Sequence, residues 1–354
     1  MTKKRDGRGS HRPVILSAHA KALSSVGLYR VGGRSFAVAQ DDRGRGRLPI
    51  GPSGVDSPLR MRASPGVNLP RILDLLLTCE AAGHVDMELH STGLRLTLTN
   101  PAFDVGRYTL PIEEDGRLLG FGVLWRGRVL GMLVHPAARG RLEERMLDWA
   151  LATVRADGVE TLIALCRSDD ALTREVYERR GFRLREEELR MGRPLETPIP
   201  SPSLPDGFTL RALDVAHELD AWLGLYAEAF GPRESQLRTW RAFRDDPDYD
   251  NALDLVIADR DGRLSAACTC SIAAAELAVI RPREGRTEPV MVREDCRGIG
   301  LGRAVVVAGL AALRARDIEL ATLTTEADNA IAHRLYESLG YRLLYTGCWH
   351  ERVV

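Results

Sequence analysis

A glycine-rich run near the end of the chain has the residue types that bind anions through the backbone. Its sequence is Arg297-Gly298-Ile299-Gly300-Leu301-Gly302-Arg303, and an apolar helical pattern follows it. Glycines at alternate positions let the backbone approach a ligand without Cβ clashes. The first N–H groups of the following helix lack intrahelical acceptors, and the helix dipole adds positive potential there. We therefore expect this turn to bind a phosphate-bearing ligand.

The spacing of these glycines excludes two common nucleotide-binding motifs. The P-loop pattern Gly-x-x-x-x-Gly-Lys-Ser/Thr is absent from the sequence. A dinucleotide fingerprint needs Gly-x-Gly-x-x-Gly in a βαβ unit, with an acidic residue ~20 positions later. The run here is Gly-x-Gly-x-Gly, and acidic residues such as Glu319 or Glu326 are too common to support that assignment.

A second motif follows the glycine run, with the sequence Asn329-Ala330-Ile331-Ala332-His333-Arg334-Leu335-Tyr336-Glu337-Ser338-Leu339-Gly340-Tyr341. Together the two motifs resemble the GNAT superfamily of acyl-CoA-dependent N-acyltransferases. The resemblance covers nearly all of residues 205–354, and a weaker version covers about residues 57–194. The tandem organisation is similar to that of mycothiol synthases. The resemblance implies two tandem mixed α+β folds, each with a mostly antiparallel central sheet flanked by helices.

The resemblance also implies a coenzyme A site built largely from backbone groups. The pyrophosphate would lie on the amides of the glycine run, and the pantetheine arm would pair with the strand edge at residues 289–292. The thioester would end near the mouth between that strand and residues 319–324. The implied cofactor-binding residues are Met291, Val292, Arg297, Gly298, Ile299, Gly300, Leu301, Gly302, Arg303 and Asn329.

Tyr336 matches the family position that protonates the departing thiolate. A phenol with a reference pKa of ~10 is a competent acid for a thiolate of pKa ~8.5 only when it is held close to it. The alternative is a core aromatic on an amphipathic helix. For Asn329 the two interpretations are a contact with pantetheine or its loop, and a helix cap.

The attacking amine must lose a proton, so a general base is expected. Glu288 is the leading candidate, because it lies on the strand that enters the glycine run, where the family often places a carboxylate. The alternative is an exposed strand-end acid, with Glu326 and Asp328 as reserve candidates for the base. His333 is expected at the surface. The sequence has no Ser/His/Asp or Cys/His nucleophile pattern, which favours direct attack by the amine over an acyl-enzyme.

Periodicity and turn residues indicate the elements that position these groups. Asp261-Gly262 is a turn pair typical of a β-hairpin, and Gly340 suits the left-handed position that ends a helix. The order of elements predicts an α/β chain with a substantially antiparallel sheet rather than a doubly wound fold. In the second copy we expect strands at residues 208–211, 253–259, 264–272, 288–293, 319–324, 341–345 and 348–353, and helices at 215–230, 235–245, 300–315 and 328–339.

Repeated segments indicate a duplicated domain. Arg139-Gly140 recurs as Arg297-Gly298, 158 residues later, and residues 177–182 recur as 336–341, 159 later. Residues 115–118 recur 146 later, which places an insertion of about a dozen residues in the second copy, within an expected loop at residues 274–286. Offsets this long exclude a solenoid. We predict an N-terminal domain at 55–193, a proline-rich linker at 194–205 and an active C-terminal domain at 206–354.

The first copy departs from the cofactor pattern. Leu142 and Glu144 stand where the second copy has Gly300 and Gly302, with Glu143 beside them. Two carboxylates would repel a pyrophosphate, and their bulk would obstruct it, so we expect no ordinary coenzyme A binding there. Tyr177 and Asp170 align with Tyr336 and Asn329, and we expect them to serve packing. The first copy is then expected to be a structural or substrate-shaping partner, and our hypothesis is that it walls one side of the acceptor pocket.

Residues 1–54 differ from the rest of the chain. They are rich in Gly, Arg and Ser without sustained periodicity, and hold 11 basic and 3 acidic side chains. We predict that they are disordered. Part of this segment resembles a translated bacterial intergenic repeat, which favours a true translation start near Val55.

Composition restricts the function classes. The chain of 354 residues is neutral overall, so residues 55–354, with 38 basic and 46 acidic side chains, carry a net charge of −8. That balance argues against nucleic acid as a partner and weakly favours a cationic acceptor. No apolar run is long enough to span a membrane. The six cysteines have no zinc spacing, so we expect no metal and a cytoplasmic, reducing location. Cys268 and Cys270 are expected on one strand face.

The sequence therefore predicts an acyl-CoA-dependent N-acyltransferase. Acetyl-CoA is the expected donor, acting as a substrate rather than a resident cofactor. The expected partner is a small-molecule amine that attacks directly in a ternary complex. The alternatives are a non-catalytic acyl-CoA-binding or regulatory protein of the same fold, and a protein N-acetyltransferase. The acceptor, the acyl chain preference and the oligomeric state have no sequence feature that identifies them.

Overall fold

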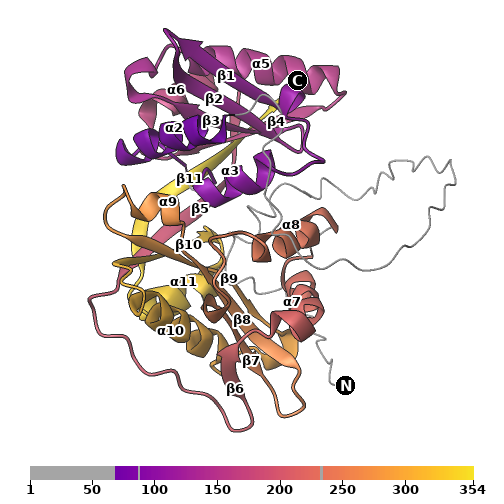
Figure 1. The fold of residues 1–354 in the computed structure, drawn as a ribbon, viewed down its shortest axis with the longest axis vertical. Coiled ribbons are helices and arrows are strands. Elements are labelled where there is room, and N and C mark those ends of the chain that lie inside the picture. The colour runs from indigo at the N-terminus through magenta and orange to yellow at the C-terminus, as the bar shows by residue number, and fades with distance from the viewer. Residues whose placement is uncertain (1–67, 87, 232–233) are drawn as a thin grey trace, which may run out of the picture.

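The computed structural model describes residues 68–86, 88–231 and 234–354 (Figure 1). The predicted tail at residues 1–54 lies outside the described residues. We call residues 68–194 the first half and residues 206–354 the second half. Both are mixtures of helices and strands, as the sequence predicted. None of the described helices is long and apolar enough to cross a membrane.

The first half begins with helices and continues as a meander of strands. Short polar side chains start its helices: Asn68 accepts a hydrogen bond from the Arg71 N–H, and Asp170 accepts one from the Thr173 N–H. The helices are α2 (Leu69–Ala81), α3 (Ser91–Leu98), α4 (Val105–Tyr108), α5 (Glu143–Ala156) and α6 (Ala171–Arg179). The strands are β1 (Thr109–Glu114), β2 (Arg117–Trp125), β3 (Val129–Val134), β4 (Thr161–Arg167) and β5 (Arg183–Pro194).

The second half repeats this order with two additions among the described residues, a strand before its first helix and a short helix before its strand β9. Its helices are α7 (Val215–Phe230), α8 (Glu234–Arg244), α9 (Ala274–Leu277), α10 (Leu301–Arg314) and α11 (Ala330–Ser338). Its strands are β6 (Thr209–Ala212), β7 (Asp254–Ala258), β8 (Leu264–Ser271), β9 (Glu284–Val292), β10 (Leu320–Glu326) and β11 (Arg342–Val353). Short 3-10 turns lie at Pro136–Ala138, Asn251–Leu253 and Glu294–Cys296.

Most of the elements predicted for the second half are confirmed. Helix α7 has the predicted bounds and ends at Gly231, and β7 and β8 form the predicted antiparallel hairpin around Gly262. Two predictions were wrong. The strands expected at 341–345 and 348–353 are one continuous strand, because Thr346 and Gly347 stay paired with Leu189 and Glu188 of β5 instead of forming a turn. The segment 274–286 is not a plain loop, since it holds α9 and the start of β9.

The two halves share one sheet of eleven described strands, in the order β1-β2-β3-β4-β11-β5-β10-β9-β8-β7-β6. The last strand of each half is therefore exchanged. Strand β11 lies between β4 and β5 of the first half, and β5 pairs along β10 of the second half. In Figure 1 these two long strands cross from one half to the other. Side chains of β5 consequently reach the second half.

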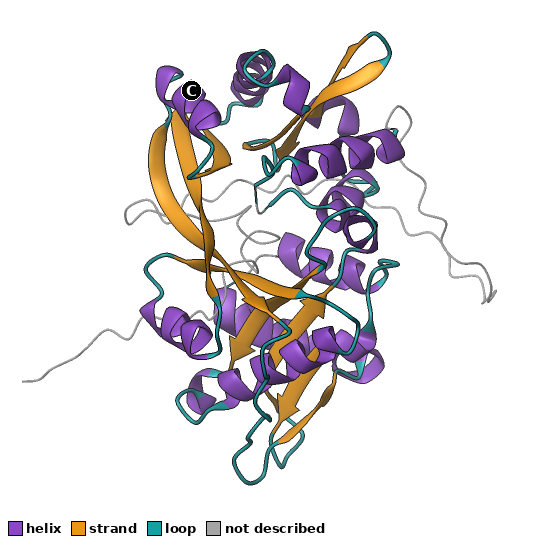
Figure 2. Ribbon diagram, turned by 90° about the vertical axis from the view of Figure 1, so that its left-hand side faces the viewer, coloured by secondary structure: helices purple, strands orange, loops and turns teal. Residues whose placement is uncertain are grey.

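Strands β9 and β10 separate soon after they meet. They pair in parallel through only three positions, the last of which is Arg286 opposite Thr322. From there β10 remains paired with β5, whereas β9 remains paired with β8. The β8–β9 register also shifts between Cys268, opposite Val290, and Cys270, opposite Thr287, so β9 bulges at this point. Figure 2 shows the molecule turned by 90° about the vertical axis from the view of Figure 1.

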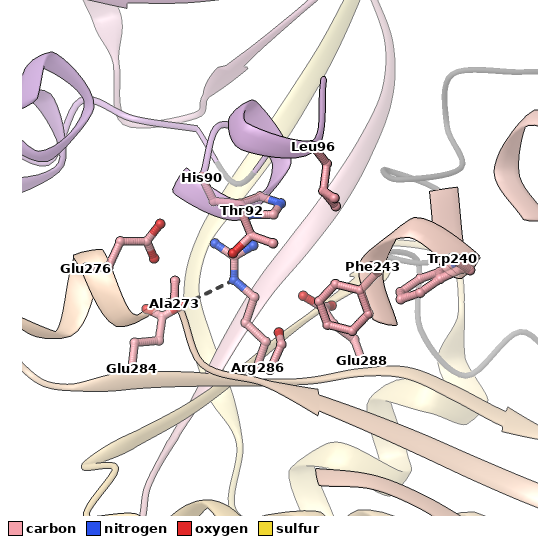
Figure 3. Close-up of a pocket in the computed structure, with 11 residues that line it drawn as sticks. His90, Thr92, Leu96, Trp240, Phe243, Ala273, Glu276, Glu284, Arg286 and Glu288 are labelled. Carbon is pink, nitrogen blue, oxygen red and sulfur yellow. Dashed lines mark ion pairs between the residues drawn. The ribbon is translucent and has the colours of Figure 1, made fainter. Parts of the chain in front are cut away.

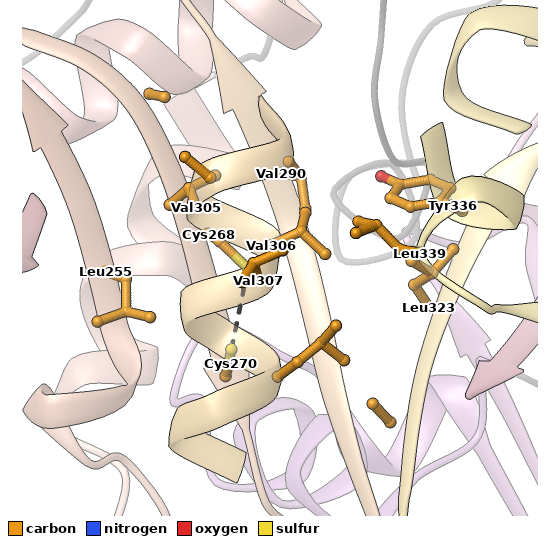
Figure 4. Packing of buried hydrophobic residues seen from close by; sticks show 14 of the residues in the cluster. Leu255, Cys268, Cys270, Val290, Val305, Val306, Val307, Leu323, Tyr336 and Leu339 are labelled. Atoms are coloured by element: carbon orange, nitrogen blue, oxygen red, sulfur yellow. Dashed lines mark hydrogen bonds between the residues drawn. The ribbon is translucent and has the colours of Figure 1, made fainter. Parts of the chain in front are cut away.

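Helices cover both faces of the second-half sheet. Because neighbouring strand residues point to opposite faces, Leu255 packs in the cluster with α10, and Val256 packs in the cluster with α7 and α8. Strand β8 has the same pattern. Cys268 and Cys270 point to the α10 face with their Sγ atoms 3.8 Å apart, which confirms the prediction that they share a face. Figure 4 shows this packing.

Candidate active site

The glycine turn leaves the amino end of α10 open. Gly298 and Gly300 have φ values of 82° and 96°, a region that costs other residues about 1–2 kcal/mol. A Cβ added to either glycine would meet no atom within 4 Å apart from its chain neighbours. Gly300 is the N-cap residue of α10, and no side chain caps that end. The first amides of α10 are therefore placed to receive an anion.

The residues of the glycine turn differ in their hydrogen bonds and in their exposure to solvent. Arg297 donates from Nε to the Val292 carbonyl at 3.3 Å, and Arg303 donates from Nη1 to Ser338 Oγ at 2.8 Å. Ile299 is exposed, Gly302 is half-buried and Leu301 is buried in the core. A hollow beside the turn is lined by residues 201–205 of the predicted linker together with Ile299, Gly300, Arg303, Ala304 and Val307.

Met291 and Val292 offer a ligand their backbone rather than their side chains. Met291 is buried in the cluster with α7 and α8, and Val292 is buried in the cluster with α10. Among the described strands, residues 287–292 pair with β8 and have no ladder partner on β10. This edge of β9 therefore faces the gap between the two separated strands.

Glu288 lies in the bulge of β9, at the start of that gap. Its side chain is buried, and its Oε2 accepts a hydrogen bond from the Thr324 N–H of β10 at 2.7 Å. Burial raises the pKa of Glu288 to about 7, and the positive charges of Arg190 and Arg286 act against that rise. A carboxyl with a pKa near neutrality can exchange a proton with an amine under physiological conditions. The alternative of an exposed strand-end acid is excluded by its burial.

Glu288 lines a pocket that both halves build (Figure 3). Residues of α3 in the first half form one wall, and residues of α8 form another. Below them, β9 contributes Glu284, Arg286 and Glu288, and Figure 3 shows Arg286 pointing up toward α3. The other lining residues are His90, Thr92, Leu96, Trp240, Phe243, Ser271, Ala273 and Glu276. The pocket thus joins apolar side chains, two glutamates of β9 and an arginine.

Tyr336 is fully buried on α11. Figure 4 shows its hydroxyl pointing toward Val290 of β9, in the cluster that also contains Leu323 of β10. Its ring contacts Tyr341 edge-on, with the centroids 5.7 Å apart. Burial raises the pKa of Tyr336 well above its ordinary value, so the hydroxyl keeps its proton. The burial of Tyr336 is compatible with a core aromatic residue. The direction of its hydroxyl, toward the β9–β10 gap, is compatible with a proton donor.

Asn329 has the geometry of a helix cap. Its Oδ1 accepts a hydrogen bond from the Ala332 N–H at 3.1 Å. The reserve candidates for the base do not line the pocket that contains Glu288. Glu326 is half-buried, and Asp328 is exposed. His333 was expected at the surface, but it is half-buried and its Nε2 lies 2.9 Å from the Glu326 carbonyl oxygen.

In the first half, a carboxylate occupies the place of the anion. Glu143 is buried, and its Oε2 accepts a hydrogen bond from the Gly140 N–H at 2.8 Å. Its other oxygen lies 3.4 Å from Nε of Arg139, which also pairs with Asp170 at 2.5 Å. The sequence predicted obstruction and repulsion here. The structure adds that the loop amide already has an internal anionic partner.

The other residues of the first copy have structural partners. Glu144 pairs with Arg179 and Arg180, so its charge is balanced instead of facing an open site. The Tyr177 hydroxyl donates to the Leu165 carbonyl at 3.2 Å, and Asp170 caps α6. These contacts agree with the packing role that the sequence predicted for both residues.

Several pocket residues were missed by the sequence analysis. Glu284 and Arg286 precede Glu288 at alternate positions of the strand, so β-periodicity could have placed all three on one face. No comparable pattern identified the α3 and α8 residues, since they come from segments far away in the chain. Among the described residues, no group of His, Cys, Asp or Glu could hold a metal ion.

Known proteins resemble this chain in sequence. The acetyltransferase (GNAT) family matches residues 70–182 and 219–341, once in each half. A mycothiol acetyltransferase of Salinispora arenicola is 33% identical over 77% of this chain and 90% of its own length. One of Thermobispora bispora is 34% identical over 59% of this chain and 71% of its own length.

Solved structures share the fold. A GCN5-related N-acetyltransferase from Sphaerobacter thermophilus has a TM-score of 0.63 at 22% identity, covering 82% of this chain and 94% of that one. A tandem GNAT protein from the clavulanic acid biosynthesis pathway also has a TM-score of 0.63, at 16% identity, covering 80% of this chain and 94% of that one. Two consecutive folds of this kind account for the repeated motifs.

Proposed function

Because this chain belongs to the acetyltransferase (GNAT) family and is an N-acetyltransferase, we propose that its second half transfers the acetyl group of acetyl-CoA to an amine of a small molecule. The amine attacks directly, in a ternary complex, and each chain has one such site. The observation that carries the proposal is Glu288, a buried carboxyl with a pKa of about 7 at the junction of the pocket and the β9–β10 gap.

The described residues fit acetyl-CoA. The open amides at the start of α10 suit a pyrophosphate, and Arg297 and Arg303 beside them add positive charge. The edge of β9 at Met291 and Val292 has no ladder partner on β10, and it suits the amides of a pantetheine arm. Acetyl-CoA supplies an acyl carbon activated as a thioester. Asn329 would act on this site through the start of α11, which it caps.

Glu288 is the proposed base. Its carboxylate removes a proton from the ammonium form of the acceptor, and the neutral amine nitrogen then forms a bond to the acetyl carbon. When the carbon–sulfur bond breaks, the electron pair goes to sulfur, and the Tyr336 hydroxyl supplies a proton to that sulfur. The nitrogen loses its second proton as the amide forms, and through solvent this proton restores the Tyr336 hydroxyl. Glu288 releases its own proton to solvent, so each cycle yields the amide, the free thiol of coenzyme A and one proton.

The pocket favours a small acceptor over a protein segment. Two helices from different halves, α3 and α8, close over Glu288, and this enclosure favours a small acceptor group over an extended peptide. The relatives are named for mycothiol. The amine precursor of mycothiol is therefore the first acceptor to test, followed by other amino sugars and diamines.

Calorimetric titration of acetyl-CoA tests the proposed site. The full chain should bind one equivalent, and Gly300→Glu should abolish binding because its carboxylate would enter the anion site. Gly116→Glu is the matched control, since Gly116 has φ of 73° and lies in the open β1–β2 hairpin turn of the first half. Loss of binding in both variants, or two sites in the unmodified chain, would contradict the proposal. Release of free thiol with the acceptor panel then tests turnover.

A further inference from the structure

A buried arginine of the first half lies beside the proposed base of the second half. Arg190 is on β5, the strand inserted between β11 and β10, and only 3% of its surface is exposed. Its Nη1 lies 3.4 Å from Glu288 Oε1. Its Nη2 donates to Thr322 Oγ1 at 2.8 Å and pairs with Glu284. The exchanged strand thus carries a positive charge into the second half.

Groups on the paired strands β5 and β10 contact both oxygens of the Glu288 carboxylate. Arg190 lies opposite Thr324 in the β5–β10 ladder, and the Thr324 N–H donates to Glu288 Oε2 at 2.7 Å. One carboxylate oxygen therefore faces Arg190 and the other is bound by the backbone beside it. Interactions of an ionised acceptor with two donors on different groups restrict how the carboxylate can turn.

We propose that Arg190 is a positioning residue for acetyl transfer, which orients the Glu288 carboxylate and stabilises its negative charge from 3.4 Å away. This inference rests on the proposed role of Glu288 as the base. It gives the first half a part in the chemistry although its own cofactor turn is filled by Glu143.

Charges from several elements face Glu288. Burial raises the pKa of Glu288, and the negative charge of Glu284 raises it further. The positive charge of Arg190 is the largest influence that lowers this pKa, followed by that of Arg286. Glu88, which precedes α3, interacts with the same carboxyl. The pocket also holds His90 and Glu276, and the core side presents Tyr336 and Cys268. An opposite charge this close lowers a carboxyl pKa by ~1–3 units, so Arg190 is the group whose removal should matter most.

The test follows the titration of Glu288 itself. In protein labelled with [5-13C]glutamate, the carboxyl resonance missing from Glu288→Gln belongs to Glu288, and its midpoint should be near pH 7. In Arg190→Gln the midpoint should rise by ~1 unit or more. Arg190→Lys should give a smaller rise, since it keeps the charge. Glu284→Gln should lower the midpoint, because it removes a like charge.

Arg193→Gln is the matched control. Arg193 is on the same strand and equally buried, with 3% of its surface exposed, but its hydrogen bonds to the described residues go to carbonyl oxygens. Its loss should leave the Glu288 midpoint unchanged. An unshifted midpoint in Arg190→Gln overturns the inference. If that variant does not fold, unshifted midpoints in both Arg190→Lys and Glu284→Gln overturn it.

Kinetics separate this inference from the proposed function. The low-pH limb of kcat/KM for acetyl transfer to the mycothiol precursor should follow the Glu288 midpoint in each variant, whereas a purely structural defect would lower activity at every pH. If the carboxyl titrates as expected but Glu288→Gln keeps the limb, the role proposed for Glu288 fails while its electrostatic pairing with Arg190 stands. If the limb depends on Glu288 but does not move in Arg190→Gln, the inference on Arg190 alone fails.

Discussion

Arg95 of α3 pairs with two aspartates that follow the end of α8, and its replacement gives the sharpest test of how the halves are held together. Its guanidinium donates to both oxygens of Asp246, at 2.9 and 2.6 Å, and to Asp248 at 2.7 Å. The Asp246 side chain is fully buried, and that of Arg95 is 15% exposed. Arg95→Met would leave these carboxylates buried without their cation, which typically costs about 3–5 kcal/mol.

The loss should appear in both stability and binding. Thermal unfolding should move down by roughly 5 °C for a loss of about 3 kcal/mol, because the unfolding entropy is ~2.1 cal/mol/K per residue over the described chain. The KM for the acceptor should rise, because Thr92 and Leu96 of α3 and Phe243 of α8 line the pocket. Affinity for acetyl-CoA should not change, since the glycine turn lies on another part of the chain.

An exposed ion pair provides the comparison. Arg141 pairs with Glu114 at 3.1 Å, and their side chains are 55% and 42% exposed. Arg141→Met should cost less than about 1 kcal/mol. The reasoning is refuted if Arg95→Met is no more destabilising than Arg141→Met in urea denaturation, or if the acceptor KM is unchanged while stability falls.

Two further predictions concern the proposed acid and the filled turn of the first half. Tyr336→Phe should lower kcat by about 10²-fold or more through loss of the proton donor, with the dissociation constant of acetyl-CoA unchanged by calorimetry; unchanged kcat would assign Tyr336 to packing alone. Glu143→Ala should destabilise the chain by about 1.5–3 kcal/mol, because it removes a buried charged hydrogen-bond acceptor, while acetyl-CoA still binds at one site per chain. A stability equal to that of the unmodified chain would show that the Glu143 contact with Gly140 contributes little.

Local patterns predicted much of the second half. The bounds of α7, the hairpin at Asp261-Gly262 and the glycine turn before α10 depend on periodicity, turn residues and positive φ, all of which act over a few residues. The burial and position of Glu288 were less accessible. Its place on a strand before the turn was predictable, but its pKa of about 7 depends on burial and on charges from other strands.

The sequence by itself determined the duplicated order of elements, the anion-binding turn of the second half and the loss of that turn in the first. These features depend on residues that are neighbours in the chain. Only the tertiary structure decided the strand exchange, the pocket between α3 and α8, and the contact of Arg190 with Glu288, 98 residues apart. Such pairings depend on which edges meet when both cores form, because a strand of suitable pattern can pair with either half, and its own residues do not specify the partner.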